Sequence, residues 1–146
     1  MALTEINLHQ SFNAPVETVF DILSDHAQFG DIISANIKRI VDSQTDYING
    51  LGSVRKIFII PTQHFEETIT AFEPNKLIEY KISKGSPLKN HTGTMKFSSQ
   101  GDNQSHLDYN IVFESKLPLP GFAPLLKVIL EKTITRGLKQ LANSLN

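Results

Sequence analysis

A broad apolar stripe near the end of the chain limits the folds that this sequence can adopt. Its members recur at the 3.6-residue spacing of an α-helix and are Leu125, Leu126, Ile129, Leu130, Ile134, Leu138 and Leu141. The stripe predicts a helix of about twenty residues, or roughly 30 Å. A stripe this wide has to be buried against another element, and the residues before it predict strands. We therefore expect the helix to lie on a β-sheet.

Alternating apolar and polar residues predict the strands of that sheet. The strictest alternation is that of Leu107, Tyr109, Ile111 and Phe113. Further strands are predicted over 6–12, 34–42, 53–60, 65–72, 77–82 and 92–98, and two short helices over 16–24 and 25–32 follow the first strand. Short connections between successive strands favour an antiparallel sheet. The expected fold is therefore α+β, with a seven-stranded antiparallel sheet and a long C-terminal helix.

Composition narrows the possible functions. The length of 146 residues suits a single domain over 1–146. The chain has no cysteine, which excludes disulfides and thiolate chemistry, and its formal charge of −1 offers no field for gripping nucleic acid. It shows no signal peptide and no apolar run of membrane-spanning length. We expect a cytoplasmic protein without stable membrane insertion.

Several segments, in the order in which they occur, resemble one known family. They are 12–20 (FNAPVETVF), 50–55 (GLGSVR), 67–74 (ETITAFEP), the Gly-Ser-Pro and His-Thr-Gly of 85–93, and the Pro-Leu-Pro-Gly before the long helix. Together they make almost the whole chain similar to the START-like (SRPBCC) helix-grip superfamily, in particular to its polyketide cyclase/dehydrase-like branch. The resemblance implies a curved sheet that grips the C-terminal helix around an apolar cavity. Similar proteins often have a tryptophan near Phe29, and here Phe29 or Ile32 is expected to take that packing role.

Strand alternation then indicates which side chains face this cavity. Five of them are polar: Arg55, Glu67, Tyr80, His91 and Tyr109. The inward direction of Arg55 leans on the resemblance, because the opposite parity of strand 53–60 is equally apolar. A few polar groups in an apolar concavity are typical of a small-molecule site. The expected apolar lining comprises Ile57, Ile59, Ile69, Met95, Phe97, Ile111, Leu126, Ile129 and Leu130.

Each polar residue also has a purely structural interpretation. Arg55 and Glu67 lie on neighbouring predicted strands and can form an ion pair that fixes the register, or they can contact a ligand. His91 follows a Gly-Ser-Pro loop and can be an ordinary polar residue there, or it can bond a ligand or transfer a proton. Tyr80 and Tyr109 can pack in the core with satisfied hydroxyls or reach a ligand.

Other motifs predict neither a cofactor nor a metal site. The Gly50-Leu51-Gly52 segment stands between strands instead of before a helix, so it is no dinucleotide fingerprint. His64, Glu66 and Glu67 are adjacent but alternate in direction, which argues against a shared metal ion. Gly137 predicts a close approach of the long helix to the sheet. The cations of that helix predict a solvated face, with an interfacial membrane helix as the alternative; they are Lys127, Lys132, Arg136 and Lys139.

The function favoured by these observations is binding of a hydrophobic small molecule, such as a lipid, a polyketide or an aromatic metabolite. The alternative is an enzyme of the cyclase or dehydratase type, in which Glu67 or His91 transfers a proton and Arg55 or a tyrosine stabilises an oxyanion. A third hypothesis is assistance to a partner protein through segment 119–126. Neither the ligand nor the oligomeric state follows from the sequence.

Overall fold

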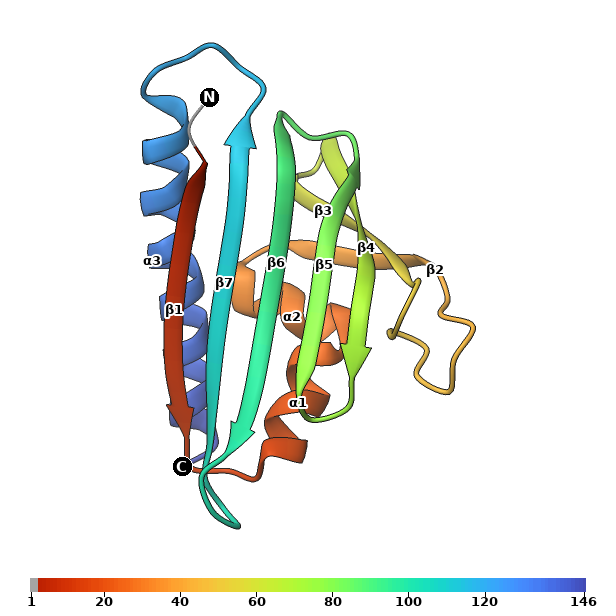
Figure 1. Cartoon of the computed structure of the whole chain (residues 1–146), viewed down its shortest axis with the longest axis vertical. Coiled ribbons are helices and arrows are strands. Elements are labelled where there is room, and N and C mark those ends of the chain that lie inside the picture. Colours follow the sequence, from red (N-terminus) through yellow and green to blue (C-terminus); the bar gives the residue numbers. More distant parts are fainter. Residues whose placement is uncertain (1–2) are drawn as a thin grey trace.

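The computed structural model describes residues 3–146, except for the side chains of residues 59 and 60. Its seven strands form one curved antiparallel sheet in the order β1-β7-β6-β5-β4-β3-β2 (Figure 1). The strands are β1 (Thr4–Phe12), β2 (Asn36–Val41), β3 (Val54–Ile60), β4 (Gln63–Glu73), β5 (Leu77–Lys84), β6 (Leu88–Ser99) and β7 (Ser105–Ser115). The predicted α+β helix-grip fold is confirmed.

Two short helices connect β1 to β2, and a long helix follows β7. Helix α1 (Val16–Ser24) begins after Pro15, and helix α2 (His26–Ile33) begins after Asp25, whose carboxylate accepts a hydrogen bond from the Gln28 amide. Helix α3 (Phe122–Ser144) runs along the β1 and β7 side of the sheet and touches α2 (Figure 1). All three predicted helices are therefore present, in the predicted order.

The core lies on the inner face of the sheet. In β7 the four residues predicted to point inward are at most 4 % exposed; they are Leu107, Tyr109, Ile111 and Phe113. The ring of Phe20 in α1 packs edge-on against Phe97 of β6 and Phe72 of β4. The two short helices thus cover one part of the sheet while α3 covers another.

A bulge in β4 changes the predicted alternation at one end of that strand. The register shifts between Ile69 and Ala71, so Phe72 pairs with the buried Ile78 of β5. Ala71 pairs instead with Glu79. Strict alternation from Ile69 would predict that Ala71 also points inward, but the extra residue in the bulge reverses the face on which later residues lie.

Helix α3 approaches α2 closely at Gly137. A Cβ atom at this glycine would lie 2.0 Å from the carbonyl oxygen of Ile32. The neighbouring stripe residues Ile134 and Leu138 are each only 2 % exposed. The close approach predicted for Gly137 is therefore present, but its partner is a helix and not the sheet.

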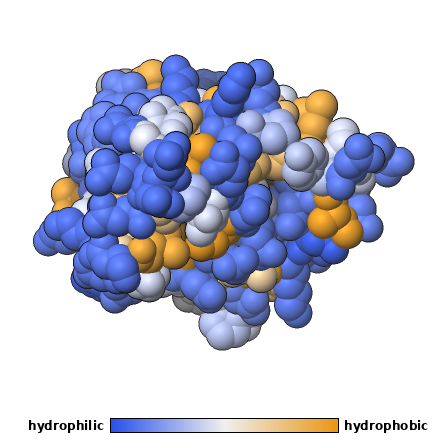
Figure 2. All heavy atoms as spheres, turned by 90° about the horizontal axis from the view of Figure 1, so that it is seen from below, coloured by the Kyte–Doolittle hydropathy of each residue, from blue (hydrophilic) through white to orange (hydrophobic). Residues whose placement is uncertain are grey.

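Hydrophobic side chains also reach the surface. The end of the molecule with the β4–β5 and β6–β7 turns is mainly hydrophilic, with separate hydrophobic patches (Figure 2). On the outer side of α3, Leu125, Val128 and Ile129 are 61 %, 47 % and 50 % exposed. Within residues 3–146, no helix has the combined length and apolar character that crossing a bilayer requires.

Candidate functional site

A buried ion pair joins β3 and β4. Arg55 and Glu67 stand directly opposite each other in the strand register and are 2 % and 5 % exposed. The Nε and Nη2 groups of Arg55 donate hydrogen bonds to the same oxygen of Glu67, Oε1, at 3.0 and 2.8 Å. The geometry is that of a charge-assisted pair, which is one of the two interpretations that the sequence predicted.

Two aromatic rings pack against the guanidinium of Arg55, and their own centroids lie 6.2 Å apart. Its Cζ atom lies 4.7 Å from the ring centroid of Phe29 and 4.7 Å from that of Tyr80. Both contacts are within the range of cation–π interactions, which strengthen where water is excluded. Since Phe29 belongs to α2 and Tyr80 to β5, the cation holds this helix against the sheet.

His26 of α2 completes the polar contacts of Arg55, and sequence reasoning missed it. Its Nδ1 accepts a hydrogen bond from Nη1 of Arg55 at 3.3 Å, so the neutral ring carries its proton on Nε2 and donates to the Ser53 hydroxyl at 3.1 Å. Burial, followed by the charges of Arg55 and Arg39, lowers the pKa of His26 to about 3. The residue is therefore a neutral connector between α2 and β3 at physiological pH.

The two carboxylate oxygens of Glu67 differ in their hydrogen bonding. Within the described part of the chain, Oε2 has no hydrogen-bond partner, whereas every fully buried polar side-chain atom there has one. Oε2 must therefore border space that a water molecule can reach. Burial raises the pKa of Glu67 above its ordinary value, and the charge and hydrogen bonds of Arg55 oppose that rise.

Two tyrosine hydroxyls meet beside this pair. The hydroxyls of Tyr80 and Tyr109 are hydrogen-bonded, and the residues are 4 % and 2 % exposed. Burial is the main cause that raises the pKa of both phenols, so both remain protonated. The Tyr80 ring lies over Gly93 of β6, where a Cβ atom would be 2.2 Å from Cζ of the ring. Only glycine leaves room for the ring at that position.

His91 lies half-buried beside Tyr80, with its ring centroid 5.5 Å from that of Tyr80. Its Nδ1 accepts a hydrogen bond from the Ile82 amide at 3.0 Å, so Nε2 of the neutral ring carries the proton. Burial, with a smaller effect of the Arg55 charge, lowers the pKa of His91 to about 4. His91 is thus a neutral donor next to the tyrosine pair at neutral pH.

The residues predicted as apolar lining fall into different environments. Leu126 and Leu130 are half-buried on the inner side of α3. Ile129 is 50 % exposed on its outer side, because one residue along a helix turns the side chain by about 100°. The side chain of Ile59 lies outside the described part of the structure. The lining residues that are fully buried are Ile57, Ile69, Met95, Phe97 and Ile111.

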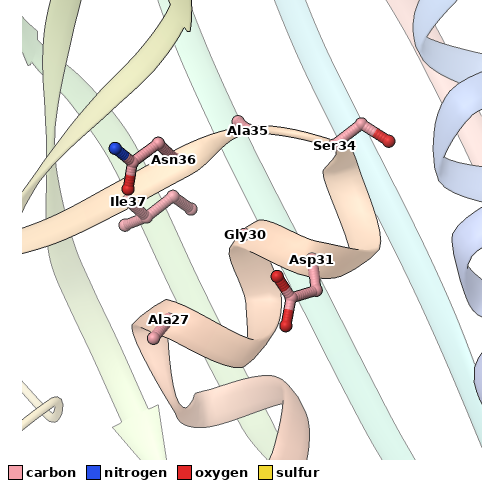
Figure 3. Close-up of a pocket in the computed structure, with 7 residues that line it drawn as sticks. All are labelled: Ala27, Gly30, Asp31, Ser34, Ala35, Asn36 and Ile37. Carbon is pink, nitrogen blue, oxygen red and sulfur yellow. The ribbon is translucent and has the colours of Figure 1, made fainter.

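Two hollows in the described part of the structure lie away from this cluster. One, of about 520 Å³, lies where α2 turns into β2, and Figure 3 shows that the side chains of Asp31, Ser34 and Asn36 point in different directions there. The other follows the outer face of α3, from Glu131 to Asn143. Neither brings polar groups together on one point. The candidate site is therefore the cluster built from Arg55, Glu67, His26, Ser53, Phe29, Tyr80, Tyr109 and His91.

Comparison with solved structures supports the fold assignment. A START superfamily protein from Mycobacterium smegmatis matches with a TM-score of 0.77 and 17 % identity, over 97 % of this chain and 99 % of that one. Ara h 8.0201 matches with a TM-score of 0.68 and 17 % identity, over 98 % and 99 %. Norcoclaurine synthase from Thalictrum flavum, solved with dopamine and hydroxybenzaldehyde, matches with a TM-score of 0.67 and 10 % identity, over 99 % and 89 %.

The family assignment comes from a match at the level of sequence. No curated protein matches the chain. The model of the family described as "Polyketide cyclase / dehydrase and lipid transport" matches residues 4–146, which include every strand and helix of the fold. The chain therefore belongs to the polyketide cyclase/dehydrase and lipid transport family.

Proposed function

We propose that the protein binds a hydrophobic small molecule between the sheet and α3, and that Glu67 receives a hydrogen bond from a polar group of that molecule. The observation that carries this proposal is the arrangement at Glu67. Arg55 donates two hydrogen bonds to Oε1, while Oε2 has no hydrogen-bond partner among the described residues and borders accessible space. A hydroxyl or amide N–H of a ligand would satisfy this oxygen.

The surroundings support an apolar body for the ligand. Side chains next to the polar cluster on the inner face are hydrocarbon or aromatic, and Leu126 and Leu130 of α3 are only half-buried. Covering them would contribute about 25 cal/mol for each Å² of apolar surface removed from water. Affinity would come from this burial, and the carboxylate would set the orientation.

Proton transfer by Glu67 is the second candidate function, and a specific observation favours it. The same burial that leaves Oε2 without a partner raises the pKa of Glu67 toward the range that general acid–base catalysis uses. The Tyr80 and Tyr109 hydroxyls and the Nε2–H of His91 are neutral donors nearby, suited to stabilising a developing oxyanion.

Ligand binding is tested first on the protein as it is purified from cells. Native mass spectrometry is expected to show a co-purified molecule, and a panel of lipids and aromatic metabolites with hydroxyl or amide groups is expected to contain binders. The Glu67→Gln variant should bind about ten- to a hundredfold more weakly, because a hydrogen bond to a charged group is worth about 1.5–3 kcal/mol. Glu66→Gln, a change at the next residue along β4, is the matched control and should bind like the wild type.

Circular dichroism has to show that the Glu67→Gln variant is folded at the assay temperature. If no molecule co-purifies with the protein and no member of the panel binds to it, the binding proposal is refuted. Equal affinity of folded Glu67→Gln and wild type would refute the role of the carboxylate. For the catalytic candidate, turnover of a polyketide-like substrate is compared in the same two proteins, and equal rates would remove Glu67 as the proton-transfer group.

A further inference from the structure

Three side chains on the outer face of the sheet converge near the β1 edge. His9 belongs to β1, and His106 and Asp108 belong to β7, so the group lies on the opposite side of the sheet from α3. In the strand register His9 stands opposite Asp108 and Ser11 stands opposite His106. One ligand atom from each of the two histidines and the aspartate lies within 4.8 Å of the other two.

The contacts within this cluster centre on one carboxylate oxygen. Oδ1 of Asp108 lies 2.5 Å from Nδ1 of His9 and 3.1 Å from Nε2 of His106. The two imidazole rings are stacked, with centroids 6.1 Å apart and an angle of 16° between their planes. Two adjacent strands thus hold two nitrogen ligands and one oxygen ligand in a fixed arrangement.

We propose that His9, His106 and Asp108 bind a divalent transition-metal ion, with Zn²⁺ as the ion that the ligand set suits. Two imidazoles and one carboxylate match the preference of Zn²⁺ for mixed nitrogen and oxygen ligands, and water would fill the open position. With bonds of about 2.0–2.1 Å, the ligand atoms of a tetrahedral zinc site lie about 3.3 Å apart. The observed separations, from 2.5 Å to at most 4.8 Å, bracket this value.

A hydrogen bond behind one ligand supports the proposal. The Ser11 hydroxyl lies 3.0 Å from Nδ1 of His106. When Nδ1–H donates to this hydroxyl, Nε2 keeps its lone pair and faces the cluster. Metal-bound histidines are usually oriented by such a partner on the other ring nitrogen. Lys96 of β6 stands opposite Asp108 on the side away from β1, so the metal would lie on the imidazole side of the carboxylate.

The proposed site has a structural consequence, because β1 is an edge strand that pairs only with β7 in the sheet order. A metal ion held by His9 on one side and by His106 and Asp108 on the other would link the two strands. An ion that binds the folded chain more tightly than the unfolded chain stabilises the fold by mass action. Zn²⁺ is therefore expected to raise the melting temperature of the protein.

The test uses isothermal titration calorimetry of the chelator-treated full chain with Zn²⁺, in a buffer that does not bind metal. We expect one Zn²⁺ per chain. His9→Gln and Asp108→Asn should each weaken binding by at least about tenfold. Loss of a residue that only hydrogen-bonds to a metal ligand already costs about 10- to 100-fold in affinity, and loss of the ligand itself should cost at least as much. His64→Gln, a substitution of an exposed histidine on β4, should leave the affinity within about twofold of the wild type and is the matched control.

A second measurement needs no variant. Electron paramagnetic resonance of the wild type with one equivalent of Cu²⁺ should show hyperfine coupling to two imidazole nitrogens. Absence of 1:1 Zn²⁺ binding would overturn the proposal. Binding that survives both His9→Gln and Asp108→Asn, or that His64→Gln abolishes, would overturn it as well. None of these readouts depends on a ligand between the sheet and α3, so failure here and failure of the proposed function are distinguishable.

Discussion

Both hydrogen bonds that Arg55 donates to Glu67 end on a single carboxylate oxygen. An arginine that only fixed a strand register would gain more from a fork-to-fork pair that uses both oxygens. Here the guanidinium instead packs against the rings of Phe29 and Tyr80 and donates its third hydrogen bond to His26. The arrangement keeps one oxygen of a buried carboxylate available.

The first prediction concerns the energy of this pair. Glu67→Gln is expected to lower the free energy of unfolding by about 3–5 kcal/mol, because it leaves the charge of Arg55 buried without a counter-ion. The double variant Arg55→Met/Glu67→Leu should be less destabilised than Glu67→Gln alone, since no isolated charge remains. Urea denaturation measures both, with Glu66→Gln as the control. A double variant that loses as much stability as Glu67→Gln, or more, would contradict this coupling of the two charges.

The second prediction concerns pH. The pKa of His26 is about 3 in the folded chain and about 6.5 in the unfolded chain, so between these values the unfolded state binds the extra proton. Stability therefore falls as the pH drops from 6.5 toward 4, and this contribution is absent above pH 6.5. His91, with a pKa of about 4 in the folded chain, also makes stability fall as the pH drops. The raised pKa of Glu67 acts in the opposite direction.

His26→Gln isolates the first of these contributions. The variant should show a shallower dependence of the free energy of unfolding on pH between 6.5 and 4, measured by urea denaturation at several pH values. His64→Gln serves as the control and should keep the wild-type slope. Identical slopes for His26→Gln and wild type would mean that His26 is not held neutral.

The third prediction concerns the space above Gly93. Gly93→Ala is expected to cost about 1–3 kcal/mol, because the new methyl group has to displace the Tyr80 ring and break its hydrogen bond to Tyr109. At Gly121, where a Cβ atom would have no neighbouring atom within 4 Å, the same substitution should be nearly neutral. Thermal melting compares the two variants, and equal melting temperatures would argue against this packing.

The fourth prediction concerns the orientation of α3. Leu130→Ala should destabilise the fold by about 1–3 kcal/mol, because Leu130 packs against the core. Ile129→Ala should change stability by no more than about 0.5 kcal/mol, since Ile129 is half exposed. Chemical denaturation of the two variants distinguishes them. A larger loss at Ile129 would mean that the helix is rotated.

The sequence predicted those features that depend on local periodicity. Period-two alternation in β7 identified its buried face, and the opposed positions of Arg55 and Glu67 followed from two adjacent strands. The apolar stripe of α3 predicted the helix but not its rotation, because Leu125, Val128 and Ile129 widen the stripe onto the exposed side. Periodicity gives no preference between two apolar faces of one helix.

Features that depend on tertiary placement were not predictable in this way. His26 reaches Arg55 only because α2 folds back over β3, although its position three residues before Phe29 places both on one helix face. The bulge after Ile69 has no local signal in the alternation. The cluster of His9, His106 and Asp108 depends on the register between β1 and β7, which no local pattern specifies.

The pairing of the first strand with the last also has a consequence for how the chain folds. Phe12 of β1 is aligned with Ser105 of β7 and Thr4 with Phe113, so the β1–β7 ladder can begin only after Ser105 has been synthesised. Contacts this distant in sequence slow folding, because a long loop has to close before they contribute any energy. During synthesis β1 therefore has no strand to pair with in this sheet until β7 emerges from the ribosome.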